Sequence, residues 1–259
     1  MGTMEGYTAL VAGGGTGIGR AIAQALHAEG AFVFICGRRE GKLKEACALI
    51  SAKGERIAGV AADVTQTQDI ERLVKSVREK RGGLDVLVNC TGIMRFGKLE
   101  ALQPAVLRDM LEVNTIAPWQ LSVAVLPLMR ARKAGSIVNI SSISGMRPFE
   151  GSGAYCMSKS ALIMMSQVMA LEVASENIRV NVICPGMVEE TELGDAVFAP
   201  DQVAASYERF RSTHPLGRNG KPRDVAAAAL FFASPQSSWI TGAVLPLDGG
   251  RHLTSNKPA

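Results

Sequence analysis

The stretch Ala12–Leu26, "AGGGTGIGRAIAQAL", decides how the rest of the chain is interpreted. It places Gly13, Gly17 and Gly19 between a short apolar run and apolar residues at helical spacing. Glycines let a backbone approach a pyrophosphate, and the amides at a helix N-terminus bind anions. Turns are rich in glycine in general, but the order strand, turn, helix predicts a dinucleotide-binding turn that includes Ile18.

Short β-branched runs alternate with amphipathic stretches along the rest of the chain, which is typical of βαβ units around a parallel sheet. Helical patterns occupy, for example, Ile18–Glu29, Lys42–Lys53, Gln68–Lys80 and Tyr155–Ser175. The seven expected strands are Tyr7–Ala12, Ala31–Cys36, Arg56–Ala61, Leu84–Asn89, Gly135–Ser141, Ile178–Cys184 and Ala243–Leu247.

These elements predict an α/β fold, with one doubly wound Rossmann domain over residues 1–259 and a seven-stranded parallel sheet. The stretch at about 187–213 is polar and only weakly helical. An insertion of this kind is expected to form a substrate lid before the last helix.

Composition narrows the classes of function. The 259 residues are 47% hydrophobic and 20% charged, as in globular proteins with a substantial core. The net charge of +4 comes without a basic tract, and no apolar run reaches the ~18 residues of a membrane span, so neither nucleic acid nor membrane is expected as a partner. No secretory signal is recognisable. Five cysteines without paired spacing and three scattered histidines favour a cytoplasmic protein without a metal site.

The second strand ends in Gly37-Arg38-Arg39, where NAD-binding folds of this kind commonly carry an acidic residue. A carboxylate there would repel a 2′-phosphate, whereas a guanidinium can bind one with two donors. Arg38 follows the strand directly and is the stronger candidate, because arginines such as Arg39 are common on loop surfaces. The sequence therefore favours NADP(H) over NAD(H).

Two further strand ends are expected to face the adenosine half of the nucleotide. Asp63 and Val64 follow the third strand and are expected beside the adenine, although a helix N-cap is the alternative for Asp63, a role that Thr65 also fits. The residues from Asn89 to Gly92 follow the fourth strand and are expected beneath the adenosine ribose.

Tyr155 and Lys159 stand four residues apart in "GAYCMSKSAL", Gly153–Leu162, whose apolar spacing predicts a helix. They therefore share one face of that helix. One interpretation is a surface pair, with the phenol stacked on the lysine stem. The other is an acid/base pair, in which the ammonium lowers a phenol pKa that starts near ~10.

The ordered motifs resemble the short-chain dehydrogenase/reductase family over essentially the whole chain, in the ordinary-length type similar to 3-oxoacyl-(acyl-carrier-protein) reductases. The matching segments are "AGGGTGIG", "DV" after the third strand, "NCTG", "EVNTIAP", "GSIVNISSISG", "YCMSK", "NVICPG" and "WITGAVLPLDGG". The chain departs from the family pattern at Ala12, where threonine is usual, and at Cys90-Thr91, where Asn-Ala is usual. Neither departure removes a catalytic group.

The resemblance implies a catalytic set and an activity, the interconversion of a carbonyl and a secondary alcohol. Tyr155 would transfer the proton, and Ser142, rather than Ser141, would hydrogen-bond the same substrate oxygen. Lys159 would lower the phenol pKa and bind the nicotinamide ribose. Asn114 would hold a water that connects Lys159 to solvent. Hydride would come from the cofactor.

The resemblance also implies cofactor contacts after the sixth strand. Pro185 and Gly186 would lie beside the nicotinamide and Val188 against its carboxamide. Glu190 stands where the family commonly has a threonine, so the next residue, Thr191, is the candidate for the pyrophosphate or the carboxamide.

Apolar side chains are expected around the reacting carbon, which favours a hydrophobic ketone or a 3-oxoacyl thioester as substrate. For Val197 and Phe198, packing of the lid onto the body is an equal alternative. Four charged loop residues, Arg95, Arg147, Glu189 and Glu190, are expected to face solvent. The expected lining residues are Met94, Phe96, Met146, Phe149, Met187, Val197 and Phe198. The alternatives are a sugar or hydroxysteroid dehydrogenase that uses NAD(H), and a cofactor-sensing protein without catalysis.

The sequence says less about protein partners and about the oligomeric state. Arg130, Arg132 and Lys133 could form a basic patch for an acidic carrier protein or simply a solvated helix C-terminus, and Leu171 stands where carrier-protein reductases often have a basic residue. The family resemblance implies a homotetramer or a homodimer.

Overall fold

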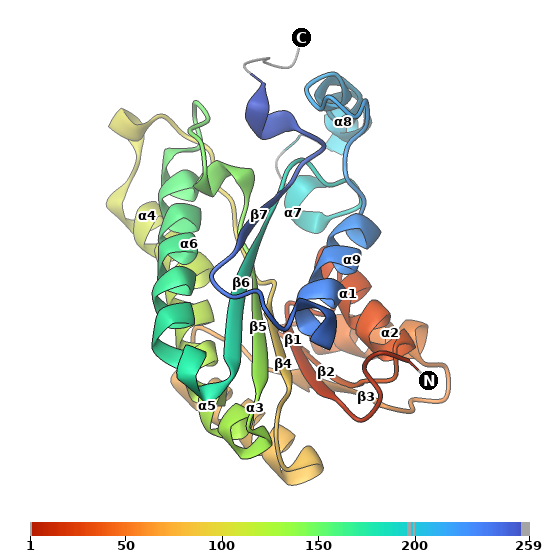
Figure 1. The fold of residues 1–259 in the computed structure, drawn as a ribbon. Helices are drawn as coiled ribbons and strands as arrows, with labels where there is room; N and C mark the ends of the chain where they lie inside the picture. The colour runs from red at the N-terminus through yellow and green to blue at the C-terminus, as the bar shows by residue number, and fades with distance from the viewer. Residues whose placement is uncertain (1, 196–197, 199, 255–259) are drawn as a thin grey trace.

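The sheet has seven parallel strands, as the sequence predicts. The computed structural model describes residues 2–195, 198 and 200–254. The strands lie in the order β3-β2-β1-β4-β5-β6-β7, and every pair of neighbours is parallel (Figure 1). Their bounds are β1 Thr8–Ala12, β2 Phe32–Gly37, β3 Ile57–Ala61, β4 Val86–Asn89, β5 Gly135–Ile140, β6 Ile178–Pro185 and β7 Val244–Leu247. These bounds differ from the predicted ones by no more than two residues at either end.

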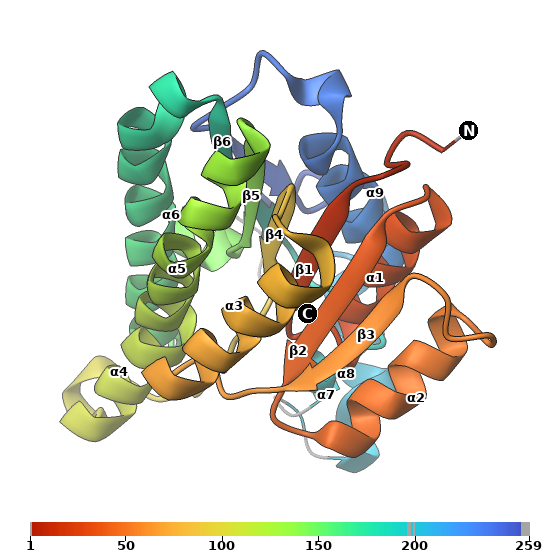
Figure 2. The same ribbon diagram turned by 90° about the horizontal axis from the view of Figure 1, so that it is seen from below.

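Helices cover both faces of the sheet, which makes the fold doubly wound (Figure 2). One face carries α1 (Gly17–Ala28), α2 (Glu40–Ile50) and α9 (Pro222–Ala233). The other carries α3 (Thr67–Arg81), α5 (Ala117–Arg132) and α6 (Gly153–Val173). The central strands are therefore buried on both faces, which explains why β1 is apolar or buried at every position instead of alternating.

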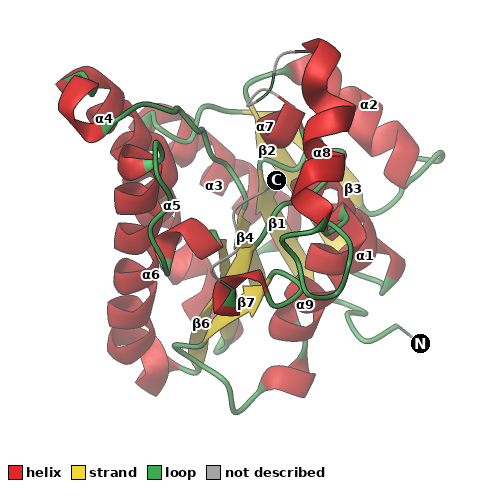
Figure 3. Ribbon diagram, turned by 90° about the horizontal axis from the view of Figure 1, so that it is seen from above, coloured by secondary structure: helices red, strands yellow, loops and turns green. Residues whose placement is uncertain are grey.

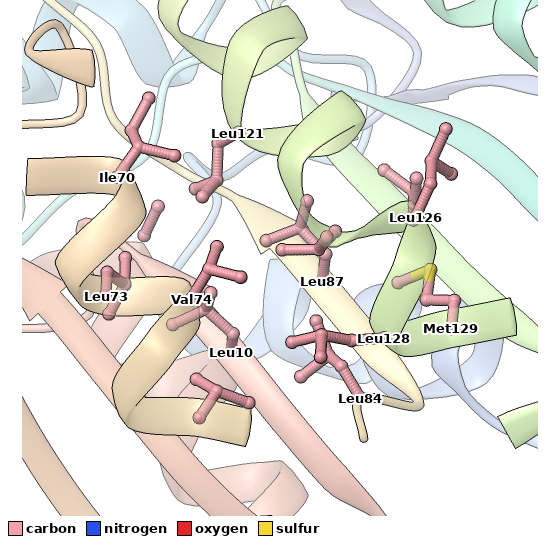
Figure 4. Close-up of a cluster of buried hydrophobic side chains, with 14 of the residues drawn as sticks. Leu10, Ile70, Leu73, Val74, Leu84, Leu87, Leu121, Leu126, Leu128 and Met129 are labelled. Atoms are coloured by element: carbon pink, nitrogen blue, oxygen red, sulfur yellow. The ribbon is translucent and has the colours of Figure 1, made fainter. Parts of the chain in front are cut away.

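One of the two large clusters of the core lies between the sheet and the helices α3 and α5 (Figure 4). Leu10 of β1 and Leu87 of β4 meet Leu73 of α3 and Leu121 of α5 there, all fully buried. A second cluster joins the opposite face to α1, α2 and α9. Burial of this kind stabilises by roughly 1.5–3 kcal/mol for each large aliphatic side chain and fixes the strand ends in place.

The carboxyl ends of all the strands meet at one edge of the sheet, which Figure 3 views from above. The strand order reverses between β1 and β4, and ligands of open α/β sheets bind outside such a switch point. The segment after β6 contains two short helices, α7 (Glu192–Asp195) and α8 (Val203–Arg211), and lies over this edge (Figures 1 and 3). On the other side the edge is bordered by α4 (Pro104–Leu111).

Among the described residues, none of the helices combines the length and the apolar character that crossing a bilayer requires.

Candidate active site

The glycine turn after β1 is built so that only glycine fits. Gly13 has a φ of +77°, in the left-handed region that other residues rarely adopt. A Cβ on Gly19 would lie 2.1 Å from the main-chain oxygen of Gly13, far inside van der Waals contact. Helix α1 begins at Gly17, and the first amides of a helix have no acceptor within the helix itself. The turn therefore fits a bound phosphate group, because the main chain there is both close-packed and rich in donors.

Thr191 lies against this turn. A Cβ on Gly17 would be 3.5 Å from the Thr191 methyl carbon, and the Thr191 side chain is buried. Its hydroxyl donates to the main-chain oxygen of Val188 at 3.2 Å. The segment after β6 thus reaches the turn after β1, as its candidate role at the pyrophosphate requires.

The two arginines after β2 differ in their surroundings. The exposed side chain of Arg38 makes no hydrogen bond or ion pair within residues 2–195, 198 and 200–254. Arg39 is a surface arginine, with its side chain 60% exposed, and it pairs with Glu192 of α7. Glu192, which no sequence motif marks, also accepts a hydrogen bond from Thr16 at 3.3 Å.

The side chain of Asp63 accepts hydrogen bonds from a residue of its own loop. Its Oδ1 accepts hydrogen bonds from the main-chain N–H of Thr65 at 3.0 Å and from the Thr65 hydroxyl at 2.8 Å. This is the local turn contact that the helix-cap alternative anticipates, although the residue that precedes α3 is Gln66. Val64 is buried beside it.

The side chain of Asn89 is engaged inside the protein. It is 2% exposed and donates to the hydroxyl of Ser122 at 3.0 Å and to Oδ1 of Asn139 at 2.8 Å. Asn139 in turn donates to the hydroxyl of Ser166. Because its amide is used between β4, β5 and the helices behind them, Asn89 joins the sheet to α5 and α6 and can offer a nucleotide only main-chain atoms.

Tyr155 and Lys159 lie on the inner face of α6, where they are 5% and 3% exposed. This burial rules out the surface-pair interpretation. Lys159 Nζ lies 5.9 Å from the centre of the tyrosine ring and donates to the main-chain oxygen of Ile140 at 3.0 Å. A lysine ammonium is costly to bury without a partner, so the β5 carbonyl is what holds it there.

Burial changes the acid strength of both groups. It raises the pKa of Tyr155 to about 12, an effect that its hydrogen bond with Ser142 only partly offsets. It also lowers the pKa of Lys159 to about 8. The expected lowering of the phenol pKa by the lysine is therefore wrong for this structure, because desolvation of both side chains dominates.

Two consecutive serines at the end of β5 have different partners. The buried hydroxyl of Ser141 donates to the main-chain oxygen of Lys159 at 3.0 Å. The hydroxyl of Ser142 is hydrogen-bonded to Tyr155 and accepts from the main-chain N–H of Ser144 at 3.1 Å. Ser142 is therefore the serine whose hydroxyl shares a site with the phenol.

Asn114 lies in a π-helical turn, Glu112–Ile116, between α4 and α5. π-Helical turns are rare in proteins, and those that occur are often found at functional sites. Its Oδ1 accepts from the N–H of Ile93 at 2.8 Å, and its amide donates to the oxygen of Ile93 and to the hydroxyl of Ser158. Both hydrogens of the side-chain amide are thus engaged, whereas Oδ1 accepts one hydrogen bond and keeps a second lone pair, so a water at Asn114 can bind either Oδ1 or the main chain. At Gly92 an added Cβ would lie 3.5 Å from Lys159 Nζ and 3.4 Å from Asn114 Oδ1, which brings these groups together.

The segments after β4, β5 and β6 supply apolar side chains around this centre. Met94 packs in a cluster with Tyr155, Ala154 and Met110. Met146 is 41% exposed at the rim. The half-buried Met187 is fixed by its N–H, which donates to Nε2 of His214 at 3.4 Å.

The side chain of Phe149 is less available to line a substrate pocket than expected. It packs on Ile143, Val182 and Cys184, and the guanidinium carbons of Arg147 and Arg251 lie 5.2 Å and 5.4 Å from its ring centre. Phe96 is exposed and Val197 lies outside the described residues. Phe198 packs on Tyr207 and Phe210 of α8, which belong to the same 187–213 segment, so these contacts are internal to the expected lid.

Two charged residues expected to face solvent are instead engaged. Arg147 donates to the main-chain oxygens of Arg251, His252 and Thr254, which ties residues 251–254 to the loop after β5. Glu189, whose side chain is 15% exposed, accepts from Asn219 at 2.9 Å. Arg95 and Glu190 are exposed, as expected.

His214 and Arg251 were not anticipated from the sequence. His214 is 2% exposed, its Nδ1 lies 2.8 Å from the oxygen of Phe210, and burial lowers its pKa, which leaves Nε2 neutral and able to accept from Met187. Arg251 is held over the rings of Phe149 and Phe210. A lone histidine and an arginine near a chain end carry no spacing signal that could have identified them.

Comparisons with known proteins agree with this architecture. A family described as enoyl-(acyl carrier protein) reductase matches residues 12–252. A 3-oxoacyl-(acyl-carrier-protein) reductase FabG of Vibrio harveyi is 37% identical over 250 residues, 96% of this chain and 99% of that protein. The 2-(S)-hydroxypropyl-CoM dehydrogenase 3 of Xanthobacter autotrophicus is 35% identical over 240 residues, 93% of this chain and 94% of that protein.

Solved structures agree as well. The crystal structure of a putative short-chain dehydrogenase/reductase from Burkholderia xenovorans superposes with a TM-score of 0.93 at 33% identity, covering 99% of this chain and all of that one. The identities and the near-complete coverage show common descent rather than a shared fold alone. The chain therefore belongs to the short-chain dehydrogenase/reductase family of oxidoreductases.

Proposed function

We propose that this protein is an NADP(H)-dependent enzyme that interconverts a carbonyl and a secondary alcohol, with Tyr155 as the acid and base. The observation that carries the proposal is the hydrogen bond between the half-buried Ser142 and the buried Tyr155, which lies one helical turn from Lys159. Two hydroxyl groups that converge in a water-poor site can both bond one substrate oxygen. A protein that only sensed the cofactor would have no need of this pair.

Each residue has a distinct part in the mechanism. When bound, NADP(H) supplies or accepts the hydride. Tyr155 holds its proton at neutral pH, since its pKa is about 12, and donates it to a carbonyl oxygen that gains negative charge during reduction. Ser142 donates a hydrogen bond to the same oxygen. Lys159, whose pKa is about 8, then returns a proton toward the phenolate.

The route for that proton passes Asn114. The π-helical turn changes the register of the main-chain hydrogen bonds beside Lys159, so a main-chain oxygen there is a suitable acceptor for a water. The side chain, bonded to both main-chain groups of Ile93, holds the turn in place.

The preference for NADP(H) rests on Arg38 and Arg39 after β2. Neither position carries the carboxylate that would accept hydrogen bonds from a ribose 2′-hydroxyl and repel a 2′-phosphate. Arg38 is exposed and its guanidinium is available to a phosphate from solvent.

The substrate is a hydrophobic ketone or a 3-oxoacyl thioester. Met94, Met146 and Met187 give the site adaptable apolar walls. A carrier protein is the less favoured form of the thioester, because Arg130 is paired with Glu176 and Arg132 donates to the oxygen of Arg81. Arg132 Nε also lies 3.8 Å from the carboxylate of Asp85, so Glu176 and Asp85 partly offset the positive charge that a carrier would need.

A homologous series of ketones tests this proposal. With NADPH, kcat/KM should rise about fourfold for each methylene that enters the pocket, which corresponds to ~0.8 kcal/mol per methylene. Efficiency that stays flat along the series, or a clear preference for a free sugar, would reject the apolar pocket.

A homo-oligomer is the proposed assembly. The outward faces of α5 and α6 carry large apolar side chains at helical spacing, and the two helices are neighbours on one side of the molecule (Figure 2). Contiguous apolar surface of this kind is unusual on a monomer. The exposed residues are Trp119 and Val123 of α5 and Met157, Met164, Val168 and Leu171 of α6.

A further inference from the structure

Glu192, the first residue of α7, joins the segment after β6 to two parts of the proposed cofactor site. Its carboxylate pairs with the guanidinium of Arg39, which follows β2. The same Oε2 atom accepts the hydroxyl of Thr16, the residue that precedes helix α1. In Figure 3, α7 lies close to the ends of β1 and β2, in agreement with these contacts.

The carboxylate occupies a place suited to a phosphate. The N-terminus of α1 favours negative charge, and the Arg39 guanidinium can bind a carboxylate or a phosphate through the same donors. The hydrogen bond from Arg39 also lowers the pKa of Glu192, so the side chain is ionised at neutral pH. An anion of the protein itself is therefore held where the cofactor's own anionic groups are expected.

The ion pair between Arg39 and Glu192 is weak enough for a competing anion to break it. The side chains of Arg39 and Glu192 are 60% and 50% exposed, and exposed ion pairs contribute only about 0.2–1 kcal/mol. A phosphate dianion carries more charge than a carboxylate and offers more acceptor oxygens. Arg38, next to Arg39 and unpaired among the described residues, can meet that phosphate first.

We propose that Glu192 is a specificity-determining residue that competes with the 2′-phosphate of NADP(H) for Arg39. In the cofactor-free protein Glu192 holds Arg39 and anchors α7 on the glycine turn. Binding of the 2′-phosphate takes Arg39 from Glu192, so the anchoring of α7 becomes linked to which cofactor is bound. This inference rests on the proposed use of NADP(H).

The test measures the dissociation constants of NADP+ and NAD+ by calorimetry, without any substrate, for the wild type and four variants. Glu192→Gln keeps the size of the side chain and removes its charge, so the affinity ratio of NADP+ to NAD+ should rise roughly two- to fivefold. Glu190→Gln is the matched control: Glu190 is an exposed carboxylate two residues away that pairs with Lys221 instead. It should leave the ratio unchanged.

The double variant Arg39→Ala/Glu192→Gln should show the same ratio as Arg39→Ala alone, because the competition needs both partners. An unchanged ratio in Glu192→Gln, an equal shift in Glu190→Gln, or a shift that persists without Arg39 would each overturn the inference. The wild-type ratio tests the cofactor proposal separately: a preference for NAD+ would reject NADP(H) itself, whatever the variants do.

Discussion

Lys159 donates its hydrogen bond to the main-chain oxygen of Ile140, at 3.0 Å, rather than to Tyr155, from which it is separated by one helical turn. The strand β5 thus holds the ammonium at a fixed depth beneath the phenol. In this arrangement burial, and not the charge of the lysine, dominates the acidity of the tyrosine. The proposed chemistry starts from a protonated phenol, which suits reduction of a carbonyl near neutral pH.

Replacement of Tyr155 by phenylalanine should remove the proton donor and little else. We expect turnover to fall by roughly a hundred- to ten-thousandfold, while the dissociation constant of NADPH changes little. Steady-state kinetics and a calorimetric titration provide the two measurements. Tyr7→Phe is the control. Tyr7 directly precedes β1, far from Tyr155 in the sequence, and this variant should retain full activity. Activity of Tyr155→Phe within tenfold of the wild type would reject the assignment.

Lys159→Met should change how stability depends on pH. The pKa of Lys159 is about 8 in the folded protein, below the ~10.4 of a free lysine, so between these values the unfolded state binds more protons. The contribution of this lysine to the unfolding free energy therefore rises with pH from about 8 to 10 and is most unfavourable below pH 8.

The measurement is the difference in unfolding free energy between Lys159→Met and the wild type, by denaturant titration at pH 7 and pH 9. The advantage of the variant should shrink by about 1 kcal/mol over this interval. Buried cysteines titrate in both proteins and cancel in the difference. Lys53→Met, at an exposed site, should show no such trend, and a difference that is flat with pH would contradict the burial of a charged Lys159.

Gly19→Ala should disrupt the cofactor turn. The added Cβ would lie 2.1 Å from the oxygen of Gly13, so the main chain must shift at a cost of about 1–3 kcal/mol, and NADPH binding should weaken at least tenfold. Gly41→Ala is the matched control, because nothing lies within 4 Å of a Cβ there. Thermal unfolding and an NADPH titration report the two effects. Equal behaviour of the two variants would mean that the turn tolerates a side chain.

Arg38→Asp should erode or invert the preference for NADP(H). A charge-assisted bidentate contact contributes roughly 1.5–3 kcal/mol, which is about ten- to a hundredfold in affinity. The ratio of kcat/KM with NADPH to kcat/KM with NADH measures the change. If the wild type already uses NADH as efficiently as NADPH, the loop after β2 has been misinterpreted.

Leu171→Glu should weaken the proposed contact between copies. Its side chain is 83% exposed on the apolar face of α6, and a buried carboxylate without a partner is strongly unfavourable in an interface. Sedimentation velocity should show a lower oligomeric state for this variant. Leu49→Glu, on α2 and 62% exposed, should leave the assembly intact. A wild type that sediments as a monomer would reject the oligomer outright.

The sequence alone was sufficient to predict the order and the bounds of the secondary-structure elements. The alternation of buried strands and amphipathic helices depends on local spacing, so seven strands, their direction and their bounds could be predicted. The glycine turn and the Tyr155–Lys159 spacing are also local, because each involves residues within a single turn or helix.

Contacts between distant segments were decided only by the tertiary structure. The pairing of Glu192 with Arg39 joins residues 153 positions apart, and Asn89 meets Asn139 across 50. The pKa values of Tyr155 and Lys159 depend on how deeply other elements bury them, which their own helix does not reveal. The sequence shows which side chains can carry a charge. How far each one is desolvated, and therefore how far its pKa shifts, depends on how the whole fold packs around it.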